Sequence, residues 1–243
     1  MTDAFYEKFQ KELSLLSIDL EKSKLDKFYQ YFEILVEWNK VMNLTTITEM
    51  DEVISKHFVD SLSLVKVVND MDTKGYSMID VGTGAGFPGI PLKIAFPQLQ
   101  ITLMDSLNKK VNFLNEVIEK LDLEGICAIH GRAEDLGRDV KHREQYDLCV
   151  SRAVANLSTL SEYCMPFVKV GGSFIPYKAG KIEDELAEAK HAVFLLGGKI
   201  EMTELFLLPG TEAERSLIKI NKTSGIPKKY PRKAGSPSKE PLK

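Results

Sequence analysis

The segment Asp80–Gly89, which reads Asp-Val-Gly-Thr-Gly-Ala-Gly-Phe-Pro-Gly, has the residue types and spacing of a ligand-binding loop. It follows a short apolar run and holds four glycines within eight residues. Glycine permits positive φ and lets a ligand approach where a Cβ would stand in the way. Between a strand and a helix, such a loop aims free N–H groups at a bound nucleotide or nucleoside. The segment therefore predicts a cofactor site.

Two cofactor classes fit this loop. The pattern Gly-x-Gly-x-x-Gly that begins at Gly84, with Asp105 about 20 residues further on, is typical of dinucleotide binding. The pattern acid-x-Gly-x-Gly-x-Gly, which begins at Asp80 and includes Gly82 and Gly86, indicates S-adenosylmethionine. That cofactor has an ammonium group from which a carboxylate accepts, directly or through water, whereas a carboxylate beside a pyrophosphate would be repelled. Asp80 therefore favours S-adenosylmethionine over NAD.

Two further acids lie near the ends of the next strand candidates. Asp105 ends the apolar run Gln100–Asp105, where its carboxylate would hold the ribose hydroxyls or cap a helix that begins near Leu107. Glu134 follows the run Ile126–His130, at the edge where open α/β sheets bind their ligands. We expect Glu134 either to border the adenine or to be a solvated carboxylate in the first turn of a helix.

The loop after the fourth strand candidate, Ser151–Ala155, lacks groups that activate a methyl acceptor. It has no Asn/Asp-Pro-Pro-aromatic motif, which transfer to an exocyclic amine would lead us to expect. Cys149 and Cys164 lie within a strand and a helix candidate, where we expect neither thiol to be a reactive nucleophile. An aromatic ring nitrogen with a free lone pair, such as guanine N7, needs only to be held in line with the sulfonium. The loop is therefore consistent with such an acceptor.

Arg152 in the same loop has several roles open to it. Its guanidinium would donate to guanine O6 or to a phosphate, contact the cofactor, or pair with an acid such as Glu134 or Asp135. The residue types leave these alternatives open.

The elements that position these residues alternate along the chain. Residues 1–70 have helical patterns, which include an apolar face between Leu25 and Val36 and a second helix at about Val53–Val68. From Gly75 onward, strand and helix candidates alternate, which predicts an α/β fold with a mostly parallel seven-stranded sheet covered on both faces. The last two strands lack a helix between them and predict an antiparallel edge hairpin. The strand candidates are Ser77–Val81, Gln100–Asp105, Ile126–His130, Tyr146–Ser151, Gly172–Tyr177, Lys199–Leu208 and Leu217–Asn221. The helix candidates among them are Pro88–Phe96, Ser106–Leu121, Ser158–Val168 and Ile182–Leu196.

Residues 222–243 form a basic, proline-rich tail after the predicted domain of residues 71–221. From Asn221 to the end, seven Lys or Arg and one acid give a charge of +6, so that the rest of a chain with net charge −3 carries −9. An acidic body with a basic tail predicts an anionic partner reached by the tail, unless the tail is only a solubilising end. We expect the tail to be extended or disordered until a partner binds.

The cysteines and the N-terminus bear on the compartment. Cys127, Cys149 and Cys164 form no CxxC pair and sit among apolar residues, which predicts buried thiols without a metal or redox role. The first residues show no secretion signal, and no apolar run is long enough to cross a bilayer. We therefore expect a cytoplasmic protein without a membrane partner.

Several separated segments resemble, in the right order, the family of ribosomal small subunit methyltransferase G, also called glucose-inhibited division protein B. The resemblance covers nearly the whole chain. Two places depart from the pattern: Met42, where relatives often have Tyr, and Pro176–Gly180, which replaces a more usual Leu-Lys-Gly run. The segments that carry the resemblance are Asn43–Thr45, His57–Leu62, Asp80–Pro91, Asp105–Leu107, Arg132–Glu134, Ser151–Ala153 and Lys229–Arg232.

The resemblance implies a Rossmann-like class I AdoMet-dependent methyltransferase with a helical N-terminal extension. It implies methyl transfer to N7 of a guanine in 16S ribosomal RNA, either naked or in the small-subunit particle, and we expect a monomer without a metal. The cofactor contacts that it implies are Gly82, Phe87, Ala133, Glu134 and Arg152. The loop chemistry adds Asp80, Gly84, Gly86 and Asp105. The candidates to position the acceptor are Arg152 and Lys178. The candidates to bind RNA are Lys228, Lys229, Arg232 and Lys233. His57 would be an RNA contact or a structural histidine with its hydrogen bonds satisfied.

Overall fold

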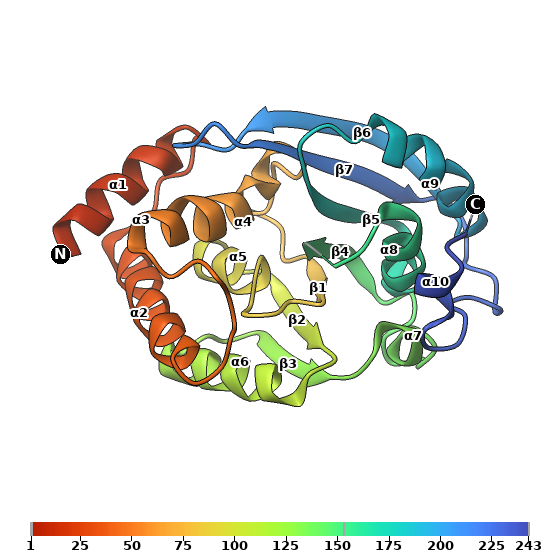
Figure 1. Cartoon of the computed structure of the whole chain (residues 1–243), viewed down its shortest axis with the longest axis horizontal. Helices are drawn as coiled ribbons and strands as arrows, with labels where there is room; N and C mark the ends of the chain where they lie inside the picture. Colours follow the sequence, from red (N-terminus) through yellow and green to blue (C-terminus); the bar gives the residue numbers. More distant parts are fainter. Residues whose placement is uncertain (1, 153, 243) are drawn as a thin grey trace.

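A computed structural model describes residues 2–152 and 154–242 and contains a seven-stranded sheet of order β3-β2-β1-β4-β5-β7-β6 (Figure 1). The strands β1 to β5 are parallel, whereas β7 pairs antiparallel with both β5 and β6. The predicted α/β class, the parallel sheet and the antiparallel edge hairpin are confirmed. The strands are β1 (Ser77–Val81), β2 (Gln100–Asp105), β3 (Ile126–His130), β4 (Tyr146–Arg152), β5 (Val168–Ala179), β6 (Gly198–Leu207) and β7 (Glu214–Lys222).

The register of the central strands brings the candidate site residues to one edge. Asp80 of β1 pairs with Leu103 of β2 and with Val150 of β4. Since parallel strands end at a common edge, the ends of β1, β2 and β4 place Asp80, Asp105 and Arg152 at the carboxyl edge of the sheet, where α/β folds bind ligands.

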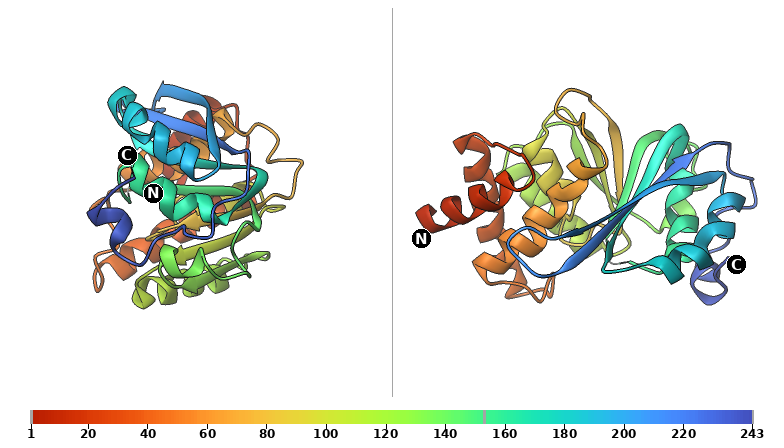
Figure 2. Two further views of the ribbon diagram at one scale, coloured as in Figure 1. Left: turned by 90° about the vertical axis from the view of Figure 1, so that its right-hand side faces the viewer. Right: turned by 90° about the horizontal axis from the view of Figure 1, so that it is seen from above.

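Helices cover both faces of the sheet, as the alternating pattern predicts (Figure 2). One apolar core joins the N-terminal helices to α5 and α6, and a second core lies beneath α8 and α9. Met78 belongs to the first core and its neighbour Ile79 to the second, because successive side chains of a strand point to opposite faces. The α-helices longer than four residues are α1 (Thr2–Ser14), α2 (Lys22–Asn39), α5 (Gly89–Ala95), α6 (Asn108–Lys120), α8 (Leu157–Cys164) and α9 (Glu183–Leu195). Two shorter α-helices after β1 are α7 (Ala133–Leu136) and α10 (Ser236–Lys239), and η3 (Met165–Phe167) is a 3₁₀ turn.

The helix predicted at about Val53–Val68 is a continuous but irregular rod that runs from Met50 to Lys66. It consists of α3 (Met50–Val53), the π-helical η1 (Ile54–Val59), α4 (Asp60–Leu62) and the 3₁₀ turn η2 (Ser63–Lys66). π turns inside helices occur frequently at functional sites, because the wider turn redirects backbone carbonyls and side chains. This π turn contains His57, whose ring stacks on Phe87 of the glycine loop.

Aromatic rings connect the N-terminal helices to that loop. Phe28 of α2 lies 5.1 Å from Phe58 of η1 between ring centroids, and Tyr31 stacks on Phe58 at 5.6 Å. Tyr31 also contacts Phe87 of the loop at 5.5 Å, and its hydroxyl donates to the carbonyl of Ala85. The N-terminal helices therefore share the core of the sheet and directly support the predicted cofactor loop.

The tail differs from the prediction, since residues 223–242 fold back on the second core. Ile226 and Tyr230 are buried there, and the short helix α10 packs against α8. The sequence did not indicate this because the buried residues are isolated between prolines and lysines, without a helical or strand period.

The expectation of three buried thiols is wrong for Cys127, which is exposed, whereas Cys149 and Cys164 are buried. Cys127 lies on β3 at the edge of the sheet, where one side of the strand has no neighbour. Within the described part of the chain, none of the helices has the length and apolar character that a membrane span requires.

Candidate cofactor and acceptor site

The glycine loop is held in a conformation that leaves little room for side chains. A Cβ on Gly86, whose φ is +95°, would lie 2.4 Å from Cδ1 of Ile90 and 2.8 Å from the Tyr31 hydroxyl. A Cβ on Gly82, whose φ is +72°, would lie 2.7 Å from Cγ2 of Val154. Both positions therefore require glycine for backbone conformation and for space.

Asp80 is fully buried, and its carboxylate holds the glycine loop through two hydrogen bonds. Its Oδ2 accepts from the Thr83 hydroxyl at 2.6 Å and from the Gly89 N–H at 2.9 Å. Its Oδ1 has no hydrogen-bond partner among the described residues, and burial raises the pKa of Asp80 to about 6. A buried carboxylate oxygen without a partner is costly, so a ligand donor that reached Oδ1 would be stabilised. The carboxylate thus fits a cationic group of a bound cofactor.

Asp105 connects the same loop to β2. Its Oδ2 accepts from the Gly84 N–H at 3.0 Å, and its Oδ1 accepts from the Leu107 N–H at 2.9 Å. The alternative of a helix cap is wrong, because α6 begins at Asn108 after Leu107 and has no side-chain cap. Asp105 instead holds the glycine loop against the start of the next connection.

A cavity of about 300 Å³ lies beyond the ends of β1, β2 and β3. Four of the predicted cofactor residues line it: Gly82, Asp105, Ala133 and Glu134. Its volume lies in the range of small-molecule binding sites. Asp80, Gly84, Gly86, Phe87 and Arg152 lie outside the set that lines it. The other lining residues are Val81, Met104, Ser106, Gly131, Arg132, Val154 and Tyr163.

Glu134 is buried at the wall of this cavity, so the alternative of a solvated carboxylate is wrong. It belongs to the four-residue helix α7, and its Oε1 accepts from the backbone N–H of Gly235 at 2.9 Å. The tail therefore supplies the hydrogen bond that orients this carboxylate.

Arg152 lies beside the cavity in a network that the sequence did not indicate. Its Nη1 donates to Oδ2 of Asp60 at 2.8 Å and to the carbonyl of Lys56 at 3.1 Å. Its guanidinium also lies over the ring of Phe87, 5.0 Å from the centroid. The ion pair that Arg152 forms is thus with Asp60, and the alternative pairing with Glu134 or Asp135 is wrong.

His57 is a neutral acceptor in this network. The Nη2 of Arg152 donates to His57 Nδ1 at 3.1 Å, so the ring proton lies on Nε2 and donates to the Thr45 hydroxyl at 2.9 Å. Burial, together with the charge of Arg152, lowers the pKa of His57 to about 3. The ring also stacks on Phe87 with 4.4 Å between centroids. His57 therefore has the hydrogen bonds of a structural histidine.

Asp60 is shared by two arginines, of which Arg215 on β7 was not among the predicted residues. The Nε of Arg215 donates to Asp60 Oδ1 at 2.9 Å, while Arg152 occupies Oδ2. Asp60 is buried, whereas both guanidinium groups are partly exposed. Two guanidinium groups beside one carboxylate leave one positive charge, which suits an anionic ligand. In the sequence, Asp60 was indicated only as part of the segment His57–Leu62 that carries the family resemblance.

Lys178 braces the loop after β4. Its Nζ donates to the carbonyl of Ala155 at 2.7 Å and to Oε1 of Glu185 at 2.6 Å, and the same Oε1 accepts from the Leu157 N–H. Lys178 therefore connects β5, the start of α8 and the loop that we expect to meet the acceptor.

The four predicted RNA-binding residues of the tail have two kinds of surroundings. Lys228, Lys229 and Lys233 are exposed. The guanidinium of Arg232 is instead paired with the buried Glu162 of α8, with 2.7 Å between Nη2 and Oε2.

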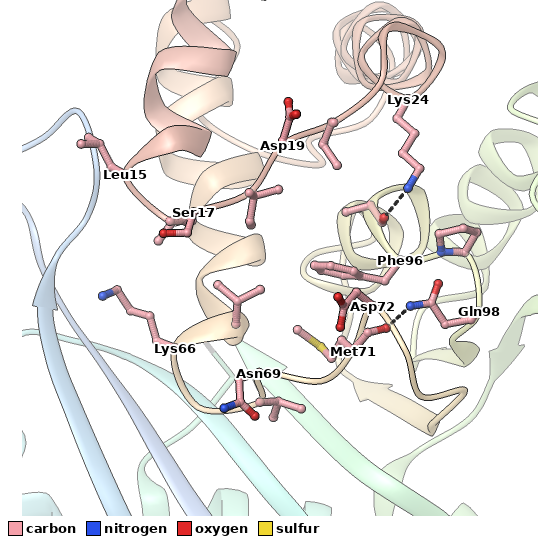
Figure 3. Close-up of a pocket in the computed structure, with 17 residues that line it drawn as sticks. Leu15, Ser17, Asp19, Lys24, Lys66, Asn69, Met71, Asp72, Phe96 and Gln98 are labelled. Carbon is pink, nitrogen blue, oxygen red and sulfur yellow. Dashed lines mark hydrogen bonds between the residues drawn. The ribbon is translucent and has the colours of Figure 1, made fainter.

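A larger cavity of about 610 Å³ lies away from this site (Figure 3). Its lining comes from the connection of α1 and α2, the end of the rod and residues 95–98, which precede β2. It therefore opens near the amino end of β2, whereas ligands of α/β sheets bind at the carboxyl ends. Lys24 and Gln98 on its wall donate to backbone carbonyls of Ala95 and Met71.

Comparison with known proteins agrees with the geometry. A family model described as rRNA small subunit methyltransferase G matches residues 24–217. The chain belongs to this family. It is 55% identical over 234 residues to ribosomal RNA small subunit methyltransferase G of Lachnoclostridium phytofermentans, covering 96% of each chain. It is 51% identical over 234 residues to the protein of the same name from an Exiguobacterium species, covering 96% of this chain and 98% of the relative.

Solved structures share the fold. TYW2 of M. jannaschii, in complex with AdoMet, matches 67% of this chain and 76% of its own with a TM-score of 0.52 and 18% identity. TrmN of Thermus thermophilus matches 70% of this chain and 53% of its own with a TM-score of 0.51 and 13% identity. The class I methyltransferase fold is therefore confirmed, and family membership confirms that the protein is a methyltransferase that uses S-adenosylmethionine.

Proposed function

We propose that the protein transfers a methyl group from S-adenosylmethionine to N7 of a guanine in 16S ribosomal RNA. The observation that carries this proposal is the absence, among the described residues around Arg152, of a group prepared to remove a proton or attack a ring. His57 is neutral with a pKa of about 3, and burial raises the pKa of the Cys149 thiol. Guanine N7 has a free lone pair and loses no proton when it is alkylated, so it needs positioning alone.

The cofactor would lie in the cavity beyond β1, β2 and β3. Asp105 and Glu134 would face its ribose and adenine, Gly82 and Ala133 would border it, and Oδ1 of Asp80 would accept from its ammonium group. The partnerless Oδ1 of Asp80 and the four predicted cofactor residues that line the cavity support this placement. When bound, the cofactor supplies a methyl group on a sulfonium, which is electrophilic without further activation.

The acceptor guanine would lie on the side of the glycine loop that faces Arg152. Arg152 has used both protons of Nη1 and one of Nη2 on the network of Asp60, Lys56 and His57. Its remaining N–H groups would donate to guanine O6 or to a flanking phosphate. Lys178 would keep the loop after β4 in place beside the acceptor, through Ala155.

The RNA would be reached in part by the tail. The exposed Lys228, Lys229 and Lys233, with Arg232 between them, form a basic segment beside an acidic body. Such a segment suits the phosphates of 16S ribosomal RNA or of the assembled small subunit. This substrate would place the protein, acting as a monomer, in the cytoplasm.

The test is to map N7-methylguanine in 16S ribosomal RNA from cells with and without the gene. Loss of one methylated guanine, restored by the wild-type gene and not by an Arg152→Ala variant, supports the proposal. Unchanged methylation would exclude it. Purified protein with labelled cofactor, given either naked RNA or small subunits that lack the modification, then distinguishes the two forms of the substrate.

A further inference from the structure

The tail, residues 223–242, forms a strap that runs past α7 and α8 (Figure 1). It contacts Glu134, which lines the cofactor cavity. Two arginines of the body hold its backbone: Arg138 donates to the carbonyl of Pro231, at 2.6 Å from Nη2, and Arg143 donates to the carbonyl of Tyr230 at 2.8 Å. Tyr230 is buried in the second core. The strap is therefore part of the folded body, although its composition predicts disorder.

The strongest attachment of the strap is an ion pair between Arg232 and Glu162. Nε of Arg232 lies 3.0 Å from Oε1, its Nη2 lies 2.7 Å from Oε2, and its backbone N–H also donates to Oε1 at 2.7 Å. The side chain of Glu162 is 0% exposed, so its charge has no compensation from solvent. Removing one partner of a buried pair leaves an unpaired buried charge, which is strongly destabilising. Without Arg232, the strap would therefore lose its attachment to α8 at Glu162.

Three residues beyond Arg232, the strap reaches the cavity wall. The N–H of Gly235, whose φ is +83°, donates to Oε1 of Glu134, and the Thr159 hydroxyl of α8 donates to the carbonyl of Pro237 at 3.1 Å. Glu134 and its neighbour on the wall, Tyr163, both line the cavity. The hydrogen bond from Gly235 occupies one oxygen of Glu134 and thereby leaves Oε2 as the oxygen for a ligand.

We propose that the strap supports the wall of the cofactor site from outside, through Glu134, and that Arg232 is a positioning residue for Glu134. Arg232 acts on the cofactor through Glu162 and Gly235, without touching it. Because Lys229 and Lys233 lie on the same strap, a substrate phosphate that binds them acts on the wall of the cofactor site, and the two ligands are coupled. The inference rests on the proposed placement of the cofactor in the cavity beside Glu134.

The experiment measures the affinity for S-adenosylhomocysteine by calorimetry in the complete absence of RNA. Arg232→Met and Glu162→Gln should each weaken binding by roughly 5-fold or more, the lower end of typical coupling between sites. The double variant should be no weaker than the worse single variant, because both changes remove the same attachment. Lys239→Met, which changes an exposed basic residue of the strap outside the proposed RNA-binding set, is the matched control and should keep the wild-type affinity.

Circular dichroism establishes that each variant is folded, and limited trypsin digestion reports whether the strap is released. Release of the strap with unchanged affinity in both Arg232→Met and Glu162→Gln would overturn the inference. Asp105→Ala, measured alongside, tests the placement of the cofactor itself. If it weakens binding while the strap variants do not, only the strap inference fails; if it leaves binding unchanged, the cofactor does not occupy this cavity and both fail.

Discussion

The buried carboxylate of Asp80 predicts how the affinity for the cofactor depends on pH. Its pKa is raised to about 6, chiefly because the group is buried, and its Oδ1 lacks a partner among the described residues. An ammonium group beside Oδ1 would stabilise the ionised form and lower this pKa again. Affinity should therefore rise with pH until Asp80 is ionised in the free protein.

The size of the effect follows from the pKa. With a pKa of about 6, roughly one tenth of the free protein has ionised Asp80 at pH 5 and roughly nine tenths at pH 7. If only the ionised form accepts from the ammonium, the Kd should be about tenfold higher at pH 5 than at pH 7, or ~1.4 kcal/mol. Asp80→Asn removes the charge and keeps an oxygen for Thr83 and Gly89, so its affinity should be low and independent of pH.

The assay is calorimetry at constant ionic strength between pH 5 and pH 7.5. S-adenosylhomocysteine carries the ammonium group, whereas 5′-methylthioadenosine lacks the amino-acid moiety and is the matched control ligand. The tenfold change should appear with the first ligand and be absent with the second. The same pH dependence for both ligands, or an unchanged dependence in Asp80→Asn, would show that Asp80 does not accept from the ammonium.

The same pKa makes a prediction about the free protein. A carboxyl whose pKa is raised on folding contributes stability below its unfolded pKa, near 3.8, and this contribution is lost as the pH rises through about 6. Between pH 5 and pH 7 the free energy of unfolding should fall by roughly 1 kcal/mol more in the wild type than in Asp80→Asn. Urea denaturation of both proteins at the two pH values measures this difference.

Three further predictions concern the cofactor class, the acceptor side and the tail. S-adenosylmethionine or its demethylated product should raise the Tm and NAD should not, and Gly84→Val should abolish the shift while the fold survives; a shift with NAD alone would contradict the cofactor class. Asp60→Asn should lower the kcat of methyl transfer, on the order of 10²-fold, with a smaller change in cofactor affinity, because Arg152 loses its orientation. Asp51→Asn, on the exposed side of the same rod, is its control, and similar losses in both variants would point to damage of the rod instead. Replacing Lys228, Lys229 and Lys233 together by Met should weaken RNA binding and reduce the slope of log K against log salt by about 2, whereas Lys199→Met should not; an unchanged slope would remove these lysines from the phosphates.

The sheet was predictable because its signals are local. Three strands, β1, β2 and β3, begin and end where the apolar runs indicated. The glycine loop, Asp105 and Glu134 then follow strand ends, so the parallel arrangement alone brings them to one edge. β5 is longer than expected, since it begins at Val168 instead of Gly172, where two glycines weaken the strand pattern.

The surroundings of Arg152 were not predictable from spacing. Its partner Asp60 lies 92 residues earlier in the chain. It follows a π turn, which no local sequence pattern predicted. Arg215, on an edge strand, reaches the same carboxylate from 155 residues away. Short-range patterns offered Glu134 and Asp135 as partners only because they are near in sequence. Side-chain pairing of this kind depends on packing between elements, which no local pattern encodes.

The boundary predicted at residue 70 separates the N-terminal helices from the strands along the chain, but it does not separate their roles at the site. Tyr31 donates to the loop carbonyl of Ala85, and its hydroxyl fills the space that a Cβ on Gly86 would need. His57 and Asp60 fix Arg152 from the same side. The family match begins at residue 24, in α2, well before the first strand. A cofactor loop that depends on Tyr31 for its shape cannot be assigned to the sheet alone, so the helices belong to the site as much as to the core.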